Sequence, residues 1–293
     1  MPELPEVEAL ARFVGRQATG RRVSRAYVAS FSALKTFDPP LEALVGRTLV
    51  EPCRRGKHLC LPFDDMTGDR IWLIVHLARG GWLKWIDVLA TERPKLSPKS
   101  PLAFRVGFDE GDGFDVTEAG TEKRLKGWVV RDPDAVENIA TLGPEPLDPS
   151  FDVAALGACL AATGGRHLKG ALADQSVIAG IGNAYSDEIL HTARLSPYKP
   201  AGKLTADELA TLHSALVSTL ADALERSVEL PAKGLKAEKK GGLAVHGRVG
   251  QNCPVCGDVV REVSFATKAL QYCATCQTGG KPLADRRMSR LLK

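Results

Sequence analysis

The sequence of 293 residues has no long hydrophobic run and only a small excess of charge. Its apolar stretches are shorter than the roughly 20 residues that span a bilayer, so we expect no membrane segment. The first residues lack the basic-then-apolar pattern of a secretory signal, which predicts a cytosolic protein. A net charge of +4 is compatible with nucleic acid binding but does not require it, so the local grouping of charges is more informative.

Cysteine is scarce, and the seven cysteines fall into two groups. An odd number without a secretion signal argues against a disulfide framework. Cys53, Cys60 and Cys159 lie apart among apolar neighbours, which is typical of buried structural thiols. The other four form two Cys-x2-Cys pairs: Cys253, Cys256, Cys273 and Cys276. This spacing predicts one tetrahedral, structural Zn²⁺ with no open position for catalysis.

The opening residues 2–8, Pro-Glu-Leu-Pro-Glu-Val-Glu, concentrate two prolines and three glutamates. If Met1 is removed, Pro2 presents a secondary amine, and an α-amino group titrates near ~7.7–8.0. Its attack on an aldehyde or a sugar C1′ gives an iminium ion, an electron sink that labilises the neighbouring proton. Glu3 is then a ready acid or base, and Glu6 is placed to shape the pocket. The same residues are also ordinary helix-start residues, so both interpretations remain open.

The residues that follow predict one helix and then a β-rich region. Apolar residues at helical spacing predict a helix over residues 7–18. From about residue 22 to residue 130, short β-rich runs alternate with Gly, Pro and Asp clusters, which favours a β-sandwich or barrel. The expected strands cover residues 23–29, 48–53, 57–63, 71–86, 104–108 and 113–117.

Three segments of this β-rich region are candidate functional sites. Residues 54–57, Arg-Arg-Gly-Lys, form a basic turn that is either a solvated hairpin or a phosphate grip with Lys57 aimed inward. Residues 76–81 interrupt an apolar strand with a charge and two glycines, which indicates a bulge or the close approach of a ligand or another backbone. Residues 122–127 form a second basic loop.

The second half of the chain predicts helices and then a small metal module. Helices are expected at residues 153–162, 167–172, 183–193 and 205–225, after a Pro- and Gly-rich linker. The segment Ala-Gly-Ile-Gly-Asn at 179–183 follows no clear strand, so we reject a dinucleotide-binding site. A glycine turn that leads into a helix is nevertheless a general phosphate-binding site. The composition of residues 229–250 predicts a mobile loop or a plain linker. The basic residues 281–293 predict a nucleic-acid contact or a disordered tail.

These motifs, in this order, resemble the Fpg/Nei family of DNA glycosylases, and its formamidopyrimidine-DNA glycosylase branch in particular. The resemblance rests on residues 2–8, on Lys57, on residues 142–147, on Gly180–Asn183 and on the four-cysteine finger that ends at Gln277. It covers nearly the whole chain. The family implies a multi-domain α+β fold: an N-terminal β-sandwich with a leading helix, a helical helix-two-turn-helix domain, and a C-terminal zinc-finger β-hairpin.

The resemblance implies the following domain bounds: 2–131 catalytic β-sandwich, 132–150 linker, 151–249 helix-two-turn-helix, 250–277 zinc finger and 278–293 basic tail. It implies a monomeric base-excision-repair enzyme that acts on damaged duplex DNA as a glycosylase and AP lyase and holds one structural Zn²⁺. Pro2 attacks C1′ of an extruded nucleoside, and Glu3 is the acid/base. Lys57 and Asn183, which follows Gly182, clamp phosphates, and β- and δ-elimination then cut the strand.

The sequence departs from the branch pattern at four positions. Lys268, in the finger, replaces an arginine, and a lysine cannot grip a phosphate bidentately. Arg79, Lys123 and Leu125 stand where the branch fills the gap left by the extruded base with Met, Arg and Phe. Together with Glu6 and Arg124, these residues complete the expected DNA contacts.

The alternatives left open are a Nei-like enzyme for oxidised pyrimidines or abasic sites, and a non-catalytic damaged-DNA binding protein. A zinc-ribbon regulator would explain the finger but not the opening residues. The sequence leaves the lesion, the opposite base, the balance of β- and δ-elimination and the removal of Met1 open.

Overall fold

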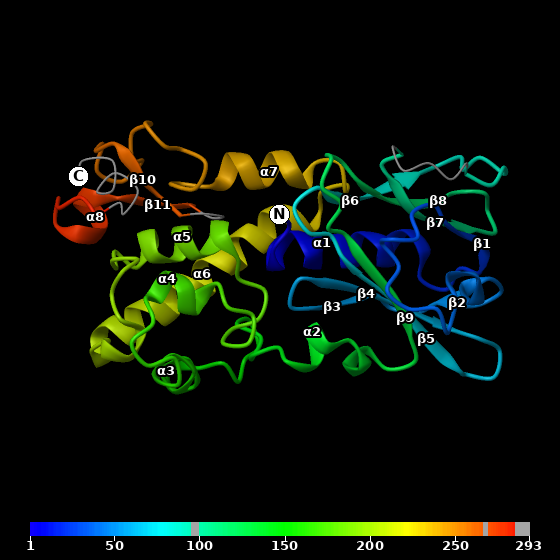
Figure 1. The fold of residues 1–293 in the computed structure, drawn as a ribbon, viewed down its shortest axis with the longest axis horizontal. Coiled ribbons are helices and arrows are strands. Elements are labelled where there is room, and N and C mark those ends of the chain that lie inside the picture. The colour runs from blue at the N-terminus through cyan, green and yellow to red at the C-terminus, as the bar shows by residue number, and fades with distance from the viewer. Residues whose placement is uncertain (95–99, 266–268, 285–293) are drawn as a thin grey trace. The chain divides into compact units, whose positions relative to one another are not determined.

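The chain divides into two compact units, whose elements are labelled in Figure 1. A computed structural model describes residues 1–94, 100–265 and 269–284. The N-terminal unit consists of Met1–Thr141 and Leu224–Lys236, and the C-terminal unit of Leu142–Ala223 and Ala237–Lys293.

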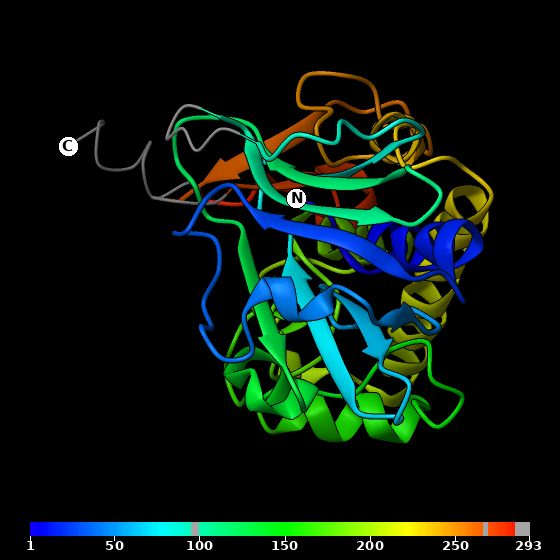
Figure 2. The same cartoon turned by 90° about the vertical axis from the view of Figure 1, so that its right-hand side faces the viewer.

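In its described residues, the N-terminal unit contains a leading helix, α1 (Leu4–Ala18), and two antiparallel sheets, which Figure 2 shows as separate layers. The four-stranded sheet has the order β1 (Val23–Val28), β7 (Leu102–Phe108), β8 (Gly113–Glu118) and β6 (Gly81–Ile86). The other sheet has the order β2 (Thr48–Leu49), β4 (His58–Asp64), β5 (Arg70–His76) and β9 (Lys126–Val130), with β3 (Cys53–Arg55) paired to β4. Short helical turns are η1 (Leu41–Leu44), η2 (Pro133–Ala135) and α2 (Glu137–Ala140).

One hydrophobic core joins α1 to both sheets. Val7, Leu10 and Val14 are fully buried on one face of the helix, as their spacing predicts, and α1 contacts β3 and β4. Phe104 and Phe114 fill the same core from the four-stranded sheet. Each large apolar side chain buried in this way contributes about 1.5–3 kcal/mol, so the start of the chain is fixed to the sheets by its helix.

The interruption at residues 76–81 is the place where the chain passes from one sheet to the other. β5 belongs to the five-stranded sheet and β6 to the four-stranded sheet. A Cβ at Gly80 would lie 2.3 Å from the carbonyl oxygen of Ala119, and one at Gly81 would lie 2.1 Å from that of Leu77. The predicted close approach of another backbone is therefore confirmed, because only glycine fits at either position.

Three details of the β-rich region correct the expectations. The run 48–53 is two strands, β2 and β3, because Pro52 precedes β3 and has no N–H for a sheet ladder. The run 57–63 begins at His58, after Lys57. β9 was missed, because its first residues close the basic loop 122–127 and its apolar part is short.

The described C-terminal unit is helical apart from the terminal hairpin. Its elements are α3 (Val153–Ala161), α4 (Leu168–Leu172), α5 (Asn183–Thr192), η3 (Ala201–Lys203), most of α6 (Ala206–Val228), most of α7 (Leu235–Gly242), β10 (Val260–Ser264), β11 (Ala269–Cys273) and α8 (Ala274–Thr278). The four predicted helices and the hairpin are confirmed, and no described strand lies between β9 and β10, in agreement with the rejected dinucleotide site.

The prediction that residues 229–250 form only a loop is wrong, because they contain α7. Its residues Lys-Ala-Glu-Lys-Lys are strong helix formers, and its first residue, Leu235, is fully buried in the core of the N-terminal unit. The helices of the described residues include none that is both long enough and apolar enough to cross a membrane.

A buried histidine and its partly buried neighbour predict acid sensitivity of the N-terminal unit. His58 and His76 are paired across β4 and β5, with ring centroids 5.0 Å apart. Burial lowers the pKa of His58 to about 4 and that of His76 to about 3, from 6.5. Below pH ~6.5 these histidines are therefore protonated in the unfolded chain but stay neutral in the folded unit. The free energy of unfolding consequently decreases as the pH falls from about 6.5 towards 4.

We expect the midpoint of thermal unfolding to fall between pH 7 and pH 5, and to fall less in His76→Gln. Tryptophan fluorescence is a selective measurement, because all four tryptophans (Trp72, Trp82, Trp85 and Trp128) belong to the N-terminal unit. The exposed His167 of the C-terminal unit offers a matched control, His167→Gln. An equal pH dependence in all three proteins would contradict the assignment.

Candidate functional site

Pro2 and Glu3 lie before the first helix and are both buried. α1 begins at Leu4, with Glu3 as the N-cap residue in an extended conformation and Pro5 in its first turn. The helix-start interpretation of the opening residues therefore applies to Pro5 and Glu6, and Pro2 lies outside it. Glu3 is 2% exposed and Glu6 1% exposed. Acidic side chains are almost never buried to this extent unless other groups hold them.

A capping box holds Glu3 and Glu6 to each other. The backbone N–H of Glu3 donates to Glu6 Oε2 at 2.7 Å, and the Glu3 carboxylate in turn accepts from the backbone N–H of Glu6. This arrangement satisfies N–H groups that a helix start otherwise leaves without intrahelical partners. The side chain of Glu6 thus fixes the backbone that carries Pro2 and Glu3, which makes Glu6 a positioning residue.

Lys57 lies in the tight turn between β3 and β4 and is 6% exposed. The turn passes through Gly56, whose φ of +54° is a left-handed conformation that favours glycine. Arg54 braces this turn: its Nη1 donates to the carbonyl oxygen of Gly56 at 3.0 Å, and its Nε lies 3.3 Å from Glu8 Oε2. Because Glu8 belongs to α1, one ion pair connects the helix behind Pro2 and Glu3 to the turn that carries Lys57.

The other predicted residues of this unit differ in exposure. Arg79 is exposed, and Arg124 pairs with Glu122 at 2.7 Å on the surface. Lys123 Nζ donates to the carbonyl oxygen of Glu118 at 2.6 Å. Leu125, in contrast, is 3% exposed and belongs to the hydrophobic core, which keeps it away from any ligand in this conformation.

The anchor of this loop, Glu118, was not anticipated. Its buried carboxylate accepts the backbone N–H groups of Arg124 and Leu125 at 2.8 and 3.0 Å. It follows the β-rich run 113–117 directly, and nothing in the sequence pattern separates it from a solvated residue at a strand end.

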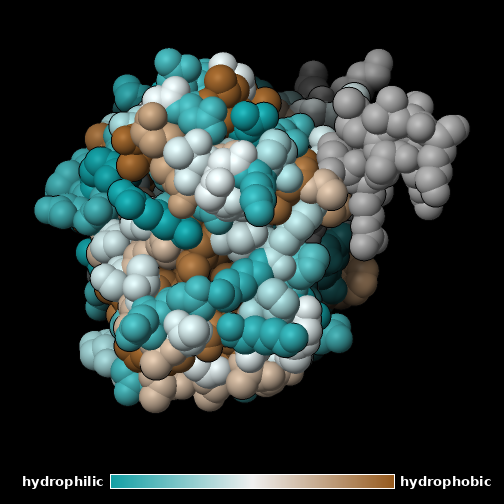
Figure 3. Space-filling model, turned by 90° about the vertical axis from the view of Figure 1, so that its left-hand side faces the viewer, coloured by the Kyte–Doolittle hydropathy of each residue, from teal (hydrophilic) through white to brown (hydrophobic). Residues whose placement is uncertain are grey.

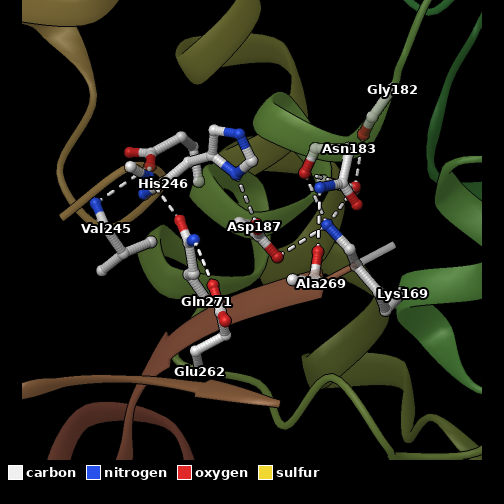
Figure 4. A network of polar contacts seen from close by, with 12 residues as sticks. Lys169, Gly182, Asn183, Asp187, Val245, His246, Glu262, Ala269 and Gln271 are labelled. Carbon is white, nitrogen blue, oxygen red and sulfur yellow. Dashed lines mark hydrogen bonds and ion pairs between the residues drawn. The ribbon is translucent and has the colours of Figure 1, made fainter. Parts of the chain in front are cut away.

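In the C-terminal unit, Gly182 is the N-cap residue of α5 and Asn183 its first helical residue. The side-chain amide of Asn183 donates to the carbonyl oxygen of Ala269, in β11, at 2.8 Å (Figure 4). The glycine-led helix start and the finger hairpin are therefore joined directly. Lys268 precedes Ala269 in the chain and lies outside the described residues.

A buried lysine, Lys169, forms hydrogen bonds with residues in the first turns of α5 (Figure 4). Lys169 Nζ donates to the carbonyl oxygen of Asn183, to Ser186 Oγ at 2.8 Å and to Asp187 Oδ1 at 2.6 Å. Asp187 is fully buried, and its other oxygen lies 2.8 Å from Nδ1 of His246. Both oxygens of this carboxylate therefore take part in one network, which neutralises a charge that burial would otherwise penalise.

The next helical residue, Glu188, binds the segment before the finger. Its carboxylate accepts the backbone N–H groups of Ala244, Val245 and His246 at 2.7 to 3.0 Å. Burial raises the pKa of Glu188, although these three donors oppose the shift. Neither Lys169 nor Glu188 was predicted; the only sequence signal was a single cation, Lys169, within the apolar helix at 167–172.

The four predicted metal ligands come together in the finger. The Sγ atoms of Cys253, Cys256, Cys273 and Cys276 all lie within 4.8 Å of one another. Tetrahedral Zn–S bonds of about 2.3 Å place the sulfur atoms about 3.8 Å apart. The Cys253–Cys276 and Cys256–Cys273 sulfur pairs lie 3.9 and 3.3 Å apart. His191 Nε2 lies 3.2 Å from Cys253 Sγ and is placed as an outer partner of the cluster. The donor set fits a closed structural zinc site.

The face of the molecule in Figure 3 carries hydrophilic and apolar residues side by side. Val255 and Val259, next to the cysteine cluster, are among the exposed large hydrophobic residues.

Three family models match the chain in succession. The formamidopyrimidine-DNA glycosylase N-terminal domain matches residues 1–127, the formamidopyrimidine-DNA glycosylase H2TH domain residues 142–231, and the zinc finger found in FPG and IleRS residues 250–279. The fold class expected from the sequence is thereby confirmed: sheets with a leading helix, a helical domain and a terminal finger.

Relatives match over long ranges as well. An uncharacterised formamidopyrimidine-DNA glycosylase-like protein of Mycobacterium tuberculosis is 62% identical over 152 residues, which cover 52% of this chain and 94% of that protein. The formamidopyrimidine-DNA glycosylase of Symbiobacterium thermophilum is 35% identical, covering 94% of this chain and 89% of that enzyme. A crystal structure of a Lactococcus lactis FPG mutant in complex with Fapy-dG-containing DNA superposes with a TM-score of 0.79 at 25% identity, covering 94% of this chain and 100% of that one. The chain belongs to the formamidopyrimidine-DNA glycosylase family of DNA-repair enzymes.

Proposed function

We propose that this protein removes oxidised or ring-opened bases from duplex DNA and then cleaves the strand as an AP lyase. The observation that carries the proposal is the placement of Pro2 and Glu3. Both are buried, outside the helix, held by Glu6, and carried by a helix that packs on the hairpin of Lys57. Ordinary helix punctuation does not require a buried Pro-Glu pair in front of the helix. Relatives that bind lesion-containing DNA give independent support.

The proposed chemistry begins at the nitrogen of Pro2 once Met1 has been removed. The secondary amine attacks C1′ of the extruded nucleotide, the C1′–base bond breaks, and the base leaves with a proton. Glu3 supplies protons for base loss and ring opening. The resulting iminium ion acidifies the C2′ proton, and its removal expels the 3′ phosphate by β-elimination, with δ-elimination on the 5′ side.

Backbone phosphates are the proposed partners of the basic groups. In the N-terminal unit these are Lys57, Arg79, Lys123 and Arg124. In the C-terminal unit, the N–H groups at the start of α5 after Gly182, together with Asn183, form an anion site whose backbone Lys169 holds in place. Lys268 adds a cation from the finger. We leave Leu125 out, because its side chain lies in the core.

Zinc has a structural role in the proposal. Four cysteine ligands leave no open coordination position, so the ion would fold the finger and orient the hairpin without taking part in the reaction. We propose a monomer of the bacterial cytosol or nucleoid, with functional domains at residues 2–131, 151–249 and 250–277, a linker at 132–150 and a basic tail at 278–293.

A second candidate concerns the lesion. Arg79 and Lys123 are exposed cations where the branch pattern has a methionine and an arginine, and Leu125 is buried where it has a phenylalanine. A changed set of gap-filling side chains favours a changed choice of opposite base or lesion. A Nei-like preference for oxidised pyrimidines is the second candidate, and the substrates tested therefore include both oxidised pyrimidines and oxidised purines.

The first prediction is an amine-dependent covalent adduct. With borohydride and duplexes that contain an abasic site, 8-oxoguanine, a formamidopyrimidine or thymine glycol, the protein with a free Pro2 should form a trapped adduct. In Pro2→Gly the rate of adduct formation should fall roughly a hundredfold or more, and in Glu3→Gln base removal should slow by about 10²–10⁴-fold. Mass spectrometry verifies the N-terminus of each protein.

Pro5→Ala is the matched control, because Pro5 belongs to the same stretch but lies within the helix. It should keep the adduct. If the protein with a free Pro2 binds damaged DNA but is trapped by no duplex, the proposed lyase is wrong, and a damaged-DNA binding protein remains.

The brace between α1 and the Lys57 turn predicts a positioning effect. Glu8→Gln removes the partly buried ion pair with Arg54, and a pair of this kind contributes about 1 kcal/mol, so the Kd for abasic-site DNA should rise about fivefold. Glu8→Asp should restore part of the affinity. Arg12→Gln, which removes the exposed partner of the same carboxylate at 2.9 Å, is the control and should change little. A Glu8→Gln protein with unchanged DNA affinity would refute the brace.

Removal of zinc should unfold the finger while the N-terminal unit stays folded. A chelator with a mild reductant should unfold the finger and weaken DNA binding roughly tenfold or more, because the hairpin that joins Asn183 is lost. The tryptophan fluorescence transition should remain, since every tryptophan lies in the N-terminal unit. Added zinc should restore binding. Full affinity without metal would show that the finger is not part of the DNA site.

A further inference from the structure

Two cysteines outside the metal cluster face each other across the hairpin of Lys57. Cys53, in β3, and Cys60, in β4, are direct partners in the antiparallel register. Directly opposite residues of paired strands place their side chains on the same face of the sheet, so the two thiols are neighbours. The expectation of scattered, buried structural thiols is therefore corrected: Cys60 is fully buried, but Cys53 is half-buried and paired with it.

The backbone geometry of this pair suits a covalent bond between the two sulfur atoms. Directly opposite residues in antiparallel strands have Cα atoms about 4.5–5.5 Å apart. Disulfides accept Cα separations of about 4.4–6.8 Å. A bond between Cys53 and Cys60 therefore requires no slip of the strands and no opening of the hairpin.

The two thiols differ in reactivity. The hydrogen bond from Cys60, assisted by Arg55, lowers the pKa of Cys53 to about 7, so a large part of this accessible thiol is thiolate at neutral pH. The hydrogen bond with Cys53 and burial raise the pKa of Cys60. An accessible thiolate beside a buried thiol is the arrangement of an attacking and a resolving cysteine.

We propose that Cys53 and Cys60 form an oxidative modification site that a hydroperoxide converts to an intramolecular disulfide. The Cys53 thiolate attacks one peroxide oxygen, the O–O bond breaks, and the products are Cys53 sulfenic acid and hydroxide. The Cys60 sulfur then attacks the Cys53 sulfur, the S–O bond breaks, and the oxygen leaves as water with the thiol proton. Both sulfur atoms are oxidised by one electron each, and the peroxide is reduced by two.

The disulfide would fasten the turn that holds Lys57. In the described residues, β3 is three residues long and pairs only with β4, so few interactions hold it in the sheet. Cys53 directly precedes Arg54, which braces Gly56. A bond at this position closes a ring around residues 54–59 and prevents β3 from separating from β4. This inference does not depend on the proposed function, because it concerns the thiols and the hairpin alone.

The test uses the full-length, zinc-loaded protein and limiting hydrogen peroxide, followed by alkylation, proteolysis and mass spectrometry. The expected product is a peptide pair joined through Cys53 and Cys60, lighter by two hydrogens and restored by dithiothreitol. Cys60→Ala should instead retain a sulfenic acid on Cys53, trapped with dimedone, and Cys53→Ser should leave Cys60 unmodified. Cys159→Ser, which removes a distant half-buried thiol, should not alter the disulfide.

Hydrogen exchange gives a second measurement that does not require a variant. The amides of residues 54–59 should exchange more slowly in the oxidised protein than in the reduced protein. Tryptophan fluorescence verifies that each variant is folded. The proposal is overturned if Cys53 proceeds to sulfinic acid in the presence of Cys60, if peroxide modifies only the four finger cysteines, or if hairpin exchange is the same in both states.

Discussion

The packing of α1 against β3 and β4 is the constraint on which the N-terminal unit depends. It places the residues before the helix at a fixed position relative to the sheets, and the Glu3–Glu6 capping box then defines the backbone in front of the helix. The ion pair of Arg54 with Glu8 extends this constraint to the turn of Lys57. The proposed nucleophile at the end of the chain requires an end that is held in place, and these contacts hold it.

The C-terminal unit meets the corresponding requirement with buried charge. Lys169, Asp187 and His246 connect the start of α5 to the segment before the finger, and Asn183 connects it to β11. A helix start can receive an anion only if its N–H groups are held in place, and Lys169 holds this one through the carbonyl oxygen of Asn183. Within the C-terminal unit, the finger and the helix start therefore behave as one polar assembly joined by side-chain hydrogen bonds.

Much of this could be predicted from the sequence. The metal ligands follow from their spacing, and the helices from apolar periodicity and Gly or Pro boundaries. The residues that were missed share a physical reason. Glu118, Glu188 and Asp187 act through buried carboxylates whose partners are distant in sequence or are backbone N–H groups, and neither kind of partner leaves a residue pattern. Leu125 was placed among the expected DNA contacts by counting from nearby motifs, whereas the chain turns at this point into β9 and the core.

The anchoring of the loop after β8 has a consequence for how this protein can diverge. Glu118 holds the backbone at Arg124 and Leu125, and Gly81 lies against both Leu77 and Leu125, so the two ends of the loop are fixed by the core. The residues between these ends, 119–123, are exposed, and surface loops fixed at their ends tolerate changes in sequence and length. Selection can therefore alter the residues around Lys123 without disturbing the sheets, so that this part of the surface can change while the fold and the opening residues stay the same.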